Sequence, residues 1–331
     1  MDGKSQTKRG QGVVQWGLSV PFILMHFVPL GALWVDVSAM DWALCGVLYV
    51  VGMFFVTAGY HRYFSHRAFK TSRWMQFILA FGAQTSAQKG ALWWSSHHRH
   101  HHRHSDQDDD VHSPRHGFWW SHVGWILSDR YMHTDYDAIK DMAKYPELRF
   151  LNRYHILPSV FLGSLCFLTG GWGALCIGFF LSRILLYHGT FLVNSLAHVI
   201  GRPRYDTGDD SKNSWIIAML TLGEGWHNNH HHYQSSTTQG FYWWEIDMTY
   251  AALKVMAWMG LVWDLRRPSD RFRATNWLNG PETEVPTLLS DLPSLPSLPS
   301  LPELPAFPEL PDMADLQELS SPPTPSVQSG R

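Results

Sequence analysis

Residues 95–105 read Ser-Ser-His-His-Arg-His-His-His-Arg-His-Ser and hold six of the 20 histidines of this 331-residue chain. A buried imidazole needs a polar partner, so an apolar core has no use for such a run. If the segment is helical, His98, His101 and His102 stand at positions i, i+3 and i+4 and share one face. Three imidazoles on one face suit a borderline transition metal. The alternative is a solvated histidine tract that binds metal adventitiously.

Three further motifs also contain histidines at spacings that could serve a metal site. His227-Asn-Asn-His-His231 repeats the i, i+3, i+4 arrangement, and Asn194 stands four residues before His198. His61 and His66 are five residues apart, which places them about 140° apart on a continuous α-helix. They can share a metal only if the helix ends near His61 and the chain turns. The alternative for His61 and His66 is a pair of histidines at the membrane interface. The alternative for Asn194 and His198 is a hydrogen-bonded pair in the protein core.

The composition indicates a membrane protein. The chain is 14% aromatic and 16% charged, whereas globular proteins average roughly 25% charged residues. A net charge of −2 gives no indication of a nucleic-acid partner. The three cysteines, Cys45, Cys166 and Cys176, are too few and too scattered for an iron–sulfur cluster or a disulfide framework.

Apolar runs predict four membrane spans, at about residues 13–35, 42–60, 154–169 and 172–190. Lysine and arginine flank these runs on one side, which places residues 1–12, all histidine groups and both termini in the cytoplasm. Residues 13–275 form the predicted domain, with 246–265 as a helix against the domain or the membrane face. The Leu/Pro/Ser-rich residues 280–331 predict a disordered tail.

Taken together, the patterns HxxxxH, HRxHH, NxxxH and HxxHH, in this order, resemble the membrane fatty acid desaturases. They are most similar to the acyl-CoA Δ9 (stearoyl-CoA) desaturases, as is the stretch Phe118-Trp-Trp-Ser-His-Val-Gly-Trp125. The resemblance covers roughly residues 15–265. It implies an all-α integral membrane fold, with four transmembrane helices and a cytosolic histidine-rich helical cap that holds two iron ions. The implied ligands are His61, His66, His98, His101, His102, His198, His227, His230 and His231, with Asn194 reaching one iron through a water.

The implied activity is that of an O2-dependent oxidoreductase that introduces a cis double bond, at the Δ9 position, into a saturated fatty acyl chain. Removing hydrogen from unactivated carbons requires oxygen activated at a metal, because no side-chain acid or base can do it. The sequence has no fused cytochrome b5, ferredoxin or dinucleotide-binding signature, so electrons must come from an external donor, cytochrome b5 or ferredoxin with its reductase. A membrane diiron hydroxylase and a histidine-rich metal-binding membrane protein are the alternative functions.

Residues around the histidines are assigned further roles. Asp106, Asp110 and Glu224 lie beside the histidine motifs and are candidates to fix imidazole tautomers. The substrate contacts that the resemblance implies are Trp94, Arg130, Thr190 and Phe191.

The acyl carrier is less well defined by the sequence. Animal members have a basic and an acidic residue where this chain has Ser96 and His97. Where the family has a pair of basic residues just after Trp125, this chain has Asp129 and Arg130, so only one base remains. Coenzyme A is favoured as the carrier, with a lipid or a carrier protein as alternatives. The expected location is a bacterial inner membrane, or the endoplasmic reticulum if the protein is eukaryotic.

The second predicted span also predicts the far end of the substrate tunnel. At a rise of about 1.5 Å per residue, Met53 lies roughly 12 Å and Tyr49 roughly 18 Å below His61, near one helical face. In a Δ9 product of about 16 to 18 carbons, seven to nine carbons lie beyond the new bond, on the order of 10 Å. We therefore expect Met53 or Tyr49 to close the tunnel, although either could serve only in helix packing.

The variant Tyr49→Ala is expected to shift substrate preference toward longer chains, because the bulkier plug is removed. The double bond should stay in place, since its position depends on the distance from the head group. Product profiles on substrates of increasing chain length measure both effects. Unchanged profiles would show that Tyr49 serves only in packing.

Overall fold

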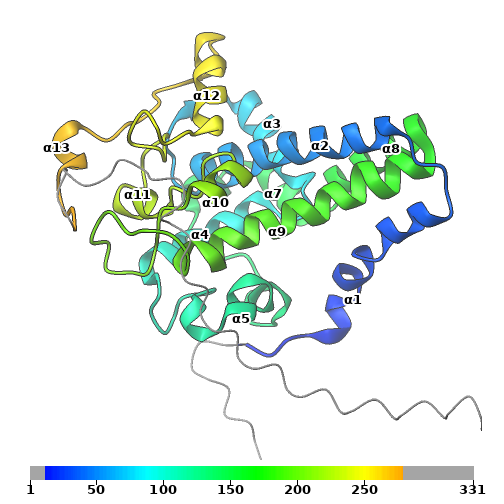
Figure 1. Ribbon diagram of the computed structural model, residues 1–331, viewed down its shortest axis with the longest axis horizontal. Coiled ribbons are helices and arrows are strands. Elements are labelled where there is room, and N and C mark those ends of the chain that lie inside the picture. Colours follow the sequence, from blue (N-terminus) through cyan, green and yellow to red (C-terminus); the bar gives the residue numbers. More distant parts are fainter. Residues whose placement is uncertain (1–11, 279–331) are drawn as a thin grey trace, which may run out of the picture. The chain divides into compact units, whose positions relative to one another are not determined.

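The computed structural model describes residues 12–278, and this part of the chain is helical. The predicted tails, residues 1–12 and 280–331, lie outside it except for residue 12. The elements in chain order are α1 (Trp16–Met25), η1 (Val28–Leu33), α2 (Ala39–Phe54), η2 (Phe55–Ser65), β1 (Lys70–Thr71), α3 (Arg73–Gln84), α4 (Ala91–His104), η3 (Pro114–His116), α5 (Phe118–His122), η4 (Gly124–Leu127), α6 (Lys140–Ala143), α7 (Pro146–Arg153), α8 (Leu157–Gly173), η5 (Ala174–Leu181), α9 (Ser182–Ser195), η6 (Leu196–His198), α10 (Trp215–Leu220), α11 (His227–His232), α12 (Met248–Trp258), β2 (Val262–Trp263) and α13 (Asp270–Arg273) (Figure 1).

Two segments of the described chain are long and apolar enough to cross a bilayer, Ala39–Ser65 and Leu157–His198. The second one folds back on itself. Gly171 has a φ of +66°, a conformation that favours glycine, and it breaks the helix between the predicted third and fourth spans. A side chain on Gly163 would lie 3.2 Å from the Phe179 ring, a contact that a straight helix could not make across 16 residues. These residues therefore form a hairpin.

The first predicted span is corrected by the structure. Residues 13–35 do not form one helix, because α1 ends at Met25 and the short 3-10 helix η1 starts at Val28. Pro29 explains the break, since its ring would clash with the carbonyl of Met25 in a continuing α-helix. The ten residues of α1 extend only about 15 Å, about half the thickness of a bilayer core.

The second span ends in a long π-helix, η2, which contains His61. The backbone N–H of His66 donates to the carbonyl of His61, a bond of 3.2 Å that spans five residues. Because a π-helix closes its turns at i+5, residues five apart face the same side. The two imidazole centroids are 4.8 Å apart. The π-helix thus brings together the two histidines that an α-helix would separate.

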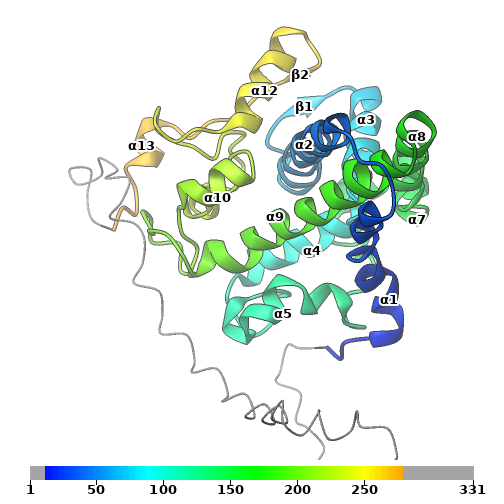
Figure 2. The ribbon, with the colours of Figure 1, turned by 45° about the vertical axis from the view of Figure 1, so that its right-hand side comes forward.

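Several of the remaining helices gather at the end of α2 and α9 that lies away from Gly171 (Figures 1 and 2). They include α4, α10 and α11. Helix α12 has 11 residues, which is too short to span a bilayer, and β2 pairs antiparallel with β1. This group of helices is called the cap below.

A buried arginine joins the cap to η2. Arg62 is 1% exposed, and its Nη1 donates to both carboxylate oxygens of Asp247, at 3.0 and 2.9 Å. Its Nε and Nη2 donate to Glu224 at 3.2 and 2.8 Å. Asp247 also caps α12 by accepting from the backbone N–H of Tyr250. One guanidinium therefore fixes η2, the segment before α11 and the start of α12.

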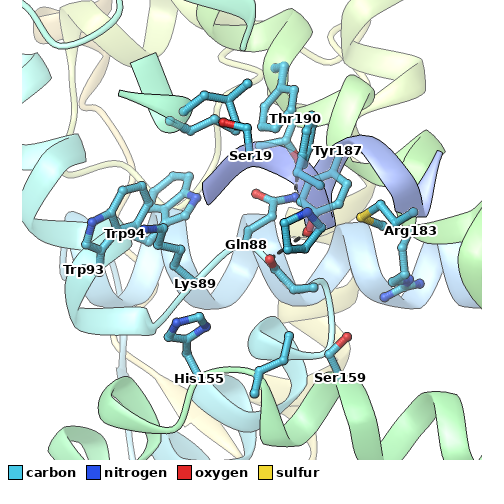
Figure 3. A pocket seen from close by; sticks show the side chains of 18 of the residues that line it. Ser19, Gln88, Lys89, Trp93, Trp94, His155, Ser159, Arg183, Tyr187 and Thr190 are labelled. Atoms are coloured by element: carbon cyan, nitrogen blue, oxygen red, sulfur yellow. Dashed lines mark hydrogen bonds between the residues drawn. The ribbon is translucent and has the colours of Figure 1, made fainter. Parts of the chain in front are cut away.

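A cavity of about 720 Å³ lies between α1, α4, α8 and α9 (Figure 3). Its walls are mainly aromatic and aliphatic, and Gln88, Lys89 and Ser159 are among its polar side chains. At the cap end the walls include His98 and Asn194.

The variant Asp247→Ala should destabilise the protein strongly, because it leaves a buried guanidinium with one carboxylate and removes the cap of α12. Removing one partner of a buried ion pair costs on the order of 3 kcal/mol or more. The measurement is the apparent Tm in detergent. Asp137→Ala, which removes an exposed pair with Lys140, is the control and should change little. Equal Tm values for both variants would contradict this role.

Candidate metal centre

Nine buried or half-buried histidines form two groups, and within each group the ring nitrogens lie within 4.8 Å of one another. Group A contains five histidines and group B contains four. Group A is His61, His66, His98, His102 and His230. Group B is His101, His198, His227 and His231. Together they are the nine histidines that the sequence singles out.

Two short helices contribute to both groups. Helix α4 directs His98 and His102 into group A and His101 into group B. Helix α11 directs His230 into group A and its neighbours His227 and His231 into group B. The groups are therefore adjacent, and the centroids of the His102 and His231 rings, which belong to different groups, are 4.5 Å apart.

The Nε2 atoms of group A point toward one another. The Nε2 atoms of His61 and His230 are 3.0 Å apart, and those of His66 and His98 are 2.9 Å apart. His102 Nε2 lies 3.0 Å from that of His98 and 2.9 Å from that of His230. In group B, the Nε2 atoms of His198 and His227 are 3.0 Å apart.

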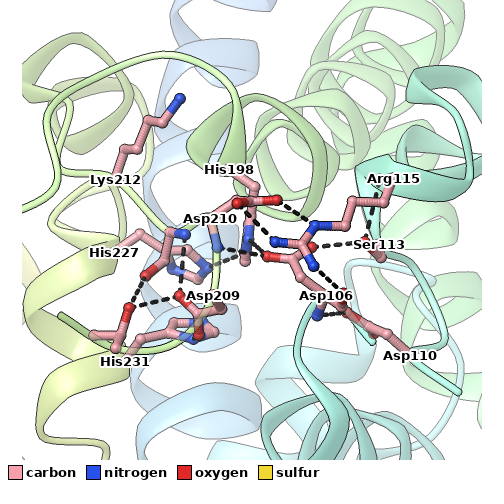
Figure 4. A network of polar contacts seen from close by, with 12 residues as sticks. Asp106, Asp110, Ser113, Arg115, His198, Asp209, Asp210, Lys212, His227 and His231 are labelled. Carbon is pink, nitrogen blue, oxygen red and sulfur yellow. Dashed lines mark hydrogen bonds and ion pairs between the residues drawn. The ribbon is translucent and has the colours of Figure 1, made fainter. Parts of the chain in front are cut away.

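Carboxylates contact the opposite nitrogen, Nδ1, of four of these rings. Asp110 lies 2.9 Å from His101 Nδ1, and Asp106 lies 2.8 Å from His198 Nδ1. Glu224 pairs with His61 Nδ1. Figure 4 shows Asp106, Asp110 and Asp209 around three histidines of group B, His198, His227 and His231. Asp106, Asp110 and Glu224 are the three acids that the sequence proposed for this role.

The fourth carboxylate was not anticipated from the sequence. Asp209, in the loop before α10, accepts from His231 Nδ1 at 2.6 Å (Figure 4). It stands 22 residues before His231, so no local spacing connects the two. Gln239 was also missed, and its Nε2 donates to Glu224 at 2.7 Å. The double asparagine of the His227 motif likewise serves the cap, because the Asn228 side chain accepts from two backbone N–H groups, of Arg204 and Tyr205.

The donor set fits a metal. A histidine that donates Nδ1–H to a carboxylate presents an unprotonated Nε2. In His101 and His231 this Nε2 is buried, has no hydrogen-bond partner among residues 12–278, and belongs to group B. Lone pairs that converge in a buried site repel one another, and a bound cation removes this repulsion. Imidazole nitrogens in this number suit iron and other borderline metals.

Electrostatics keep these groups in the required charge states. Burial lowers the pKa of His98, His102 and His230 well below the usual value, and neighbouring histidines lower it further. Burial would raise the pKa of Glu224, but His61 and Arg62 hold it at about 2. Burial would likewise raise the pKa of Asp110, but His101 holds it well below the usual range. These shifts favour neutral imidazoles at His98, His102 and His230, and ionised carboxylates at Glu224 and Asp110, at neutral pH.

The predicted substrate contacts fall into two sets. Trp94, Thr190 and Phe191 line the large cavity, and so does Asn194, which the resemblance places near one iron through a water. Trp94 stacks against His98 with centroids 4.8 Å apart, and Thr190 accepts from Gln88 at 3.0 Å. Met53 lines a smaller cavity of about 30 Å³ that also includes His61.

Tyr49 and Arg130 line neither cavity. The Tyr49 hydroxyl donates to the Leu220 carbonyl at 2.7 Å, and Arg130 lies 3.7 Å from Asp109. The role of Tyr49 as the tunnel end therefore stays a prediction.

His112 is a further buried histidine outside the sequence motifs. Its ring lies 4.2 Å from that of His101 and 5.1 Å from that of Trp125, and it lines the large cavity. Its isolated position in the sequence gave no signal of this placement.

Comparison with known proteins agrees with the site. The family model for fatty acid desaturases matches residues 40–263. An sn-1 stearoyl-lipid 9-desaturase of Anabaena variabilis is 38% identical over 259 residues, which cover 76% of this chain and 94% of the relative. An sn-2 palmitoyl-lipid 9-desaturase of Nostoc sp. (strain 36) is 35% identical over 257 residues, covering 75% and 89%. An acyl-CoA 5-desaturase of Anemone leveillei is 34% identical over 275 residues, covering 81% and 86%. With its histidine groups, its apolar helices and these matches, the chain belongs to the fatty acid desaturase family.

Proposed function

We propose that this protein introduces a cis double bond, at the Δ9 position, into a saturated fatty acyl chain. In this reaction the two carbons lose two hydrogen atoms and O2 is reduced to two waters, which requires two further electrons and two protons. The electrons come from an external donor, cytochrome b5 or ferredoxin with its reductase. Among the relatives, two act at position 9 and one at position 5 by their names, which supports this assignment without fixing the position.

The observation that supports the proposal most is the pairing of two histidine groups with an apolar cavity. The nine histidines would hold two iron ions, with five ligands around one and four around the other. Asn194 would reach one of the two irons through a water. The iron pair supplies the activation of O2 that side chains cannot provide.

The protein residues then hold the substrate and keep the site ordered. His98 belongs to group A and also lines the large cavity, so an acyl chain in this cavity reaches the metal centre. Trp94 and the hydrogen-bonded pair Gln88 and Thr190 form the wall beside it. These side chains position the reacting carbons and exclude water.

We further propose that the cap and both termini face the cytoplasm. The two apolar segments Ala39–Ser65 and Leu157–His198 would then enter the bilayer from that side. The support is the distribution of lysine and arginine along the sequence. A bacterial inner membrane, or an endoplasmic reticulum membrane in a eukaryote, would be the location.

The acyl carrier has two candidates. The sequence resemblance favours acyl-CoA, whereas the names of the relatives include both lipid-linked and CoA-linked substrates. A diiron hydroxylase would share the metal site but would yield a hydroxylated chain, and a metal-binding protein would yield no new product.

The direct test is expression in a membrane whose fatty acids are known, followed by gas chromatography of the total fatty acids. New cis-Δ9 monounsaturated chains are expected. A hydroxylated product, or no change in the presence of iron-loaded protein, would reject desaturation.

The variant His101→Ala should abolish product formation and lower bound iron, because His101 is one of only four histidines in group B. Each of the other eight histidines should behave alike. His104→Ala and His232→Ala are the controls, since neither residue belongs to a group. Product yield and iron per chain are measured together. An active His101→Ala protein would contradict the ligand assignment.

The variant Asp209→Asn should weaken iron binding or activity by about 10- to 100-fold, as loss of a carboxylate partner to a metal-bound histidine does. Its neighbour Asp210 pairs with Arg115 at the surface, so Asp210→Asn should stay close to the parent protein. Iron retention during dialysis against a chelator separates the two. Equal retention by both variants would show that Asp209 does not support His231.

A further inference from the structure

One buried ring outside the two histidine groups touches a ligand ring. His112 is 4% exposed, belongs to neither group A nor group B, and its ring centroid lies 4.2 Å from that of His101. Its Nδ1 is buried and has no hydrogen-bond partner among residues 12–278. Neither the ligand assignment nor the carboxylate contacts give this ring a role.

Aromatic rings continue from His112 toward the surface. The centroid of the Trp125 ring lies 5.1 Å from that of His112 and 6.1 Å from that of Tyr131. Aromatic rings at such separations are in contact. Three successive ring contacts therefore join the ligand His101 to Tyr131. His112, Trp125 and Tyr131 are called the aromatic row below.

The aromatic row reaches the surface at Tyr131. This residue is 7% exposed, but its two neighbours in the chain, Arg130 and Met132, are both exposed. The Arg130 guanidinium lies 5.6 Å from the centre of the Tyr131 ring. An electron donor that contacts this surface therefore comes within about one side chain of the Tyr131 ring.

A second series of rings that starts at a ligand ends inside the protein. Trp94 stacks on His98 at 4.8 Å, and Tyr60 stacks on Trp94 at 5.5 Å. Tyr60 is completely buried, and its hydroxyl donates to the Lys89 carbonyl at 2.7 Å. Of these two series, only the aromatic row connects a metal ligand with the surface.

The side chains of the aromatic row suit electron transfer. Indole and phenol rings give up an electron more readily than aliphatic side chains do, and rings in contact pass it on in short steps. Packing alone would be served as well by phenylalanine, which has no N–H to satisfy. The Trp125 Nε1 is buried and has no hydrogen-bond partner in the described part of the chain. An indole at this position therefore carries a cost that packing does not explain.

The reaction creates a need for an additional source of electrons. In desaturation, O2 receives two electrons from the donor and two hydrogen atoms from the acyl chain. Without a bound chain, complete reduction of O2 to two waters requires two additional electrons and two additional protons. If these do not arrive, the oxidising equivalents react with the nearest side chains, which are the histidine ligands themselves.

We propose that this protein has a second activity, the four-electron reduction of O2 to water when the acyl cavity is empty, with the aromatic row as the route for the two additional electrons. This inference rests on the proposed function and goes beyond it. It assigns Tyr131 and Trp125 to the protection of the histidine ligands against oxidation.

The transfer balances one electron at a time. Trp125 passes an electron through His112 and His101 to the metal centre and takes one from Tyr131. The Tyr131 O–H bond breaks, its proton goes to water, and a neutral phenoxyl radical remains. The external donor returns the electron, and water returns the proton. Two such cycles, each with one proton from solvent delivered to O2, bring the total to four electrons and four protons for two waters.

The first experiment looks for the radical. Iron-loaded protein without an acyl chain is reduced by two electrons per site, mixed with O2 and freeze-quenched for electron paramagnetic resonance. A signal that changes when the tyrosines carry ring deuterium is expected, and Tyr131→Phe should remove it. A persisting signal in Tyr131→Phe, or no tyrosyl signal in the parent protein, would overturn the inference.

Tyr136→Phe is the matched control for this experiment. An arginine also lies over the Tyr136 ring, Arg149 at 5.1 Å. Tyr136 is not part of the aromatic row, however, and is more exposed than Tyr131. Tyr136→Phe should therefore keep the radical signal, and its loss in this variant would count against Tyr131 as its site.

The second experiment measures what the aromatic row protects. The parent, Tyr131→Phe and Tyr136→Phe proteins consume equal amounts of O2 without an acyl chain, and peptide mass spectrometry then quantifies oxidised histidine among the nine ligands. Tyr131→Phe should contain severalfold more than the other two. Trp125→Phe, which keeps a ring but interrupts the row, should show the same excess. Iron per chain and apparent Tm before turnover show which variants are folded. Equal histidine oxidation in all folded variants would overturn the inference.

The third experiment separates this inference from the proposed function. With a saturated acyl substrate and reduced donor, the parent and Tyr131→Phe proteins should form product at equal initial rates, because Tyr131 lines neither cavity. A slower initial rate in Tyr131→Phe would overturn the inference, since Tyr131 would then serve desaturation itself. If neither protein forms product, the proposed function fails, and the inference is judged by the radical and by the oxidised histidines.

Discussion

The structure depends on one constraint: buried imidazoles must present unprotonated nitrogens to a common centre. Each ring has a single proton when neutral, so the opposite nitrogen needs an acceptor of its own. Asp106, Asp110, Asp209 and Glu224 supply this acceptor for four rings. The carboxylates in turn need donors, which Arg62 provides for Glu224. The polar interior of the cap therefore consists of imidazoles, the carboxylates that accept from them, and the donors that bind those carboxylates.

This network also explains how the cap and the membrane segments form one unit. Group A combines residues from η2, α4 and α11, and group B adds His198 at the end of the hairpin. Neither group can form unless both apolar segments end at the same level. The two histidine groups therefore lie at the cap ends of both apolar segments, and the large cavity reaches them at His98 and Asn194.

Much of this arrangement could be predicted from the sequence. The repeated HxxHH pattern identified six histidines, and the HxxxxH and NxxxH patterns of the resemblance added three more; the structure brings all nine together in two groups. The apolar runs identified three of the long helical segments. The break at Pro29 was missed, because hydropathy averages over single residues that stop a helix. The π-helix at His61 was also missed, since its hydrogen bonds differ from those of an α-helix without a difference in composition. Asp209 could not be found, because its contact with His231 depends on the path of a loop.

The division of α4 between the two groups has a consequence for how the protein can change during evolution. A residue inserted between His98 and His101 would rotate everything after it by about 100°. His101 and His102 would then leave their groups together, and both ion sites would be damaged by one event. Substitutions remove ligands singly, but length changes in this helix act on both sites at once. Loops and termini can vary in length, whereas the register of α4 and α11 has to be inherited intact.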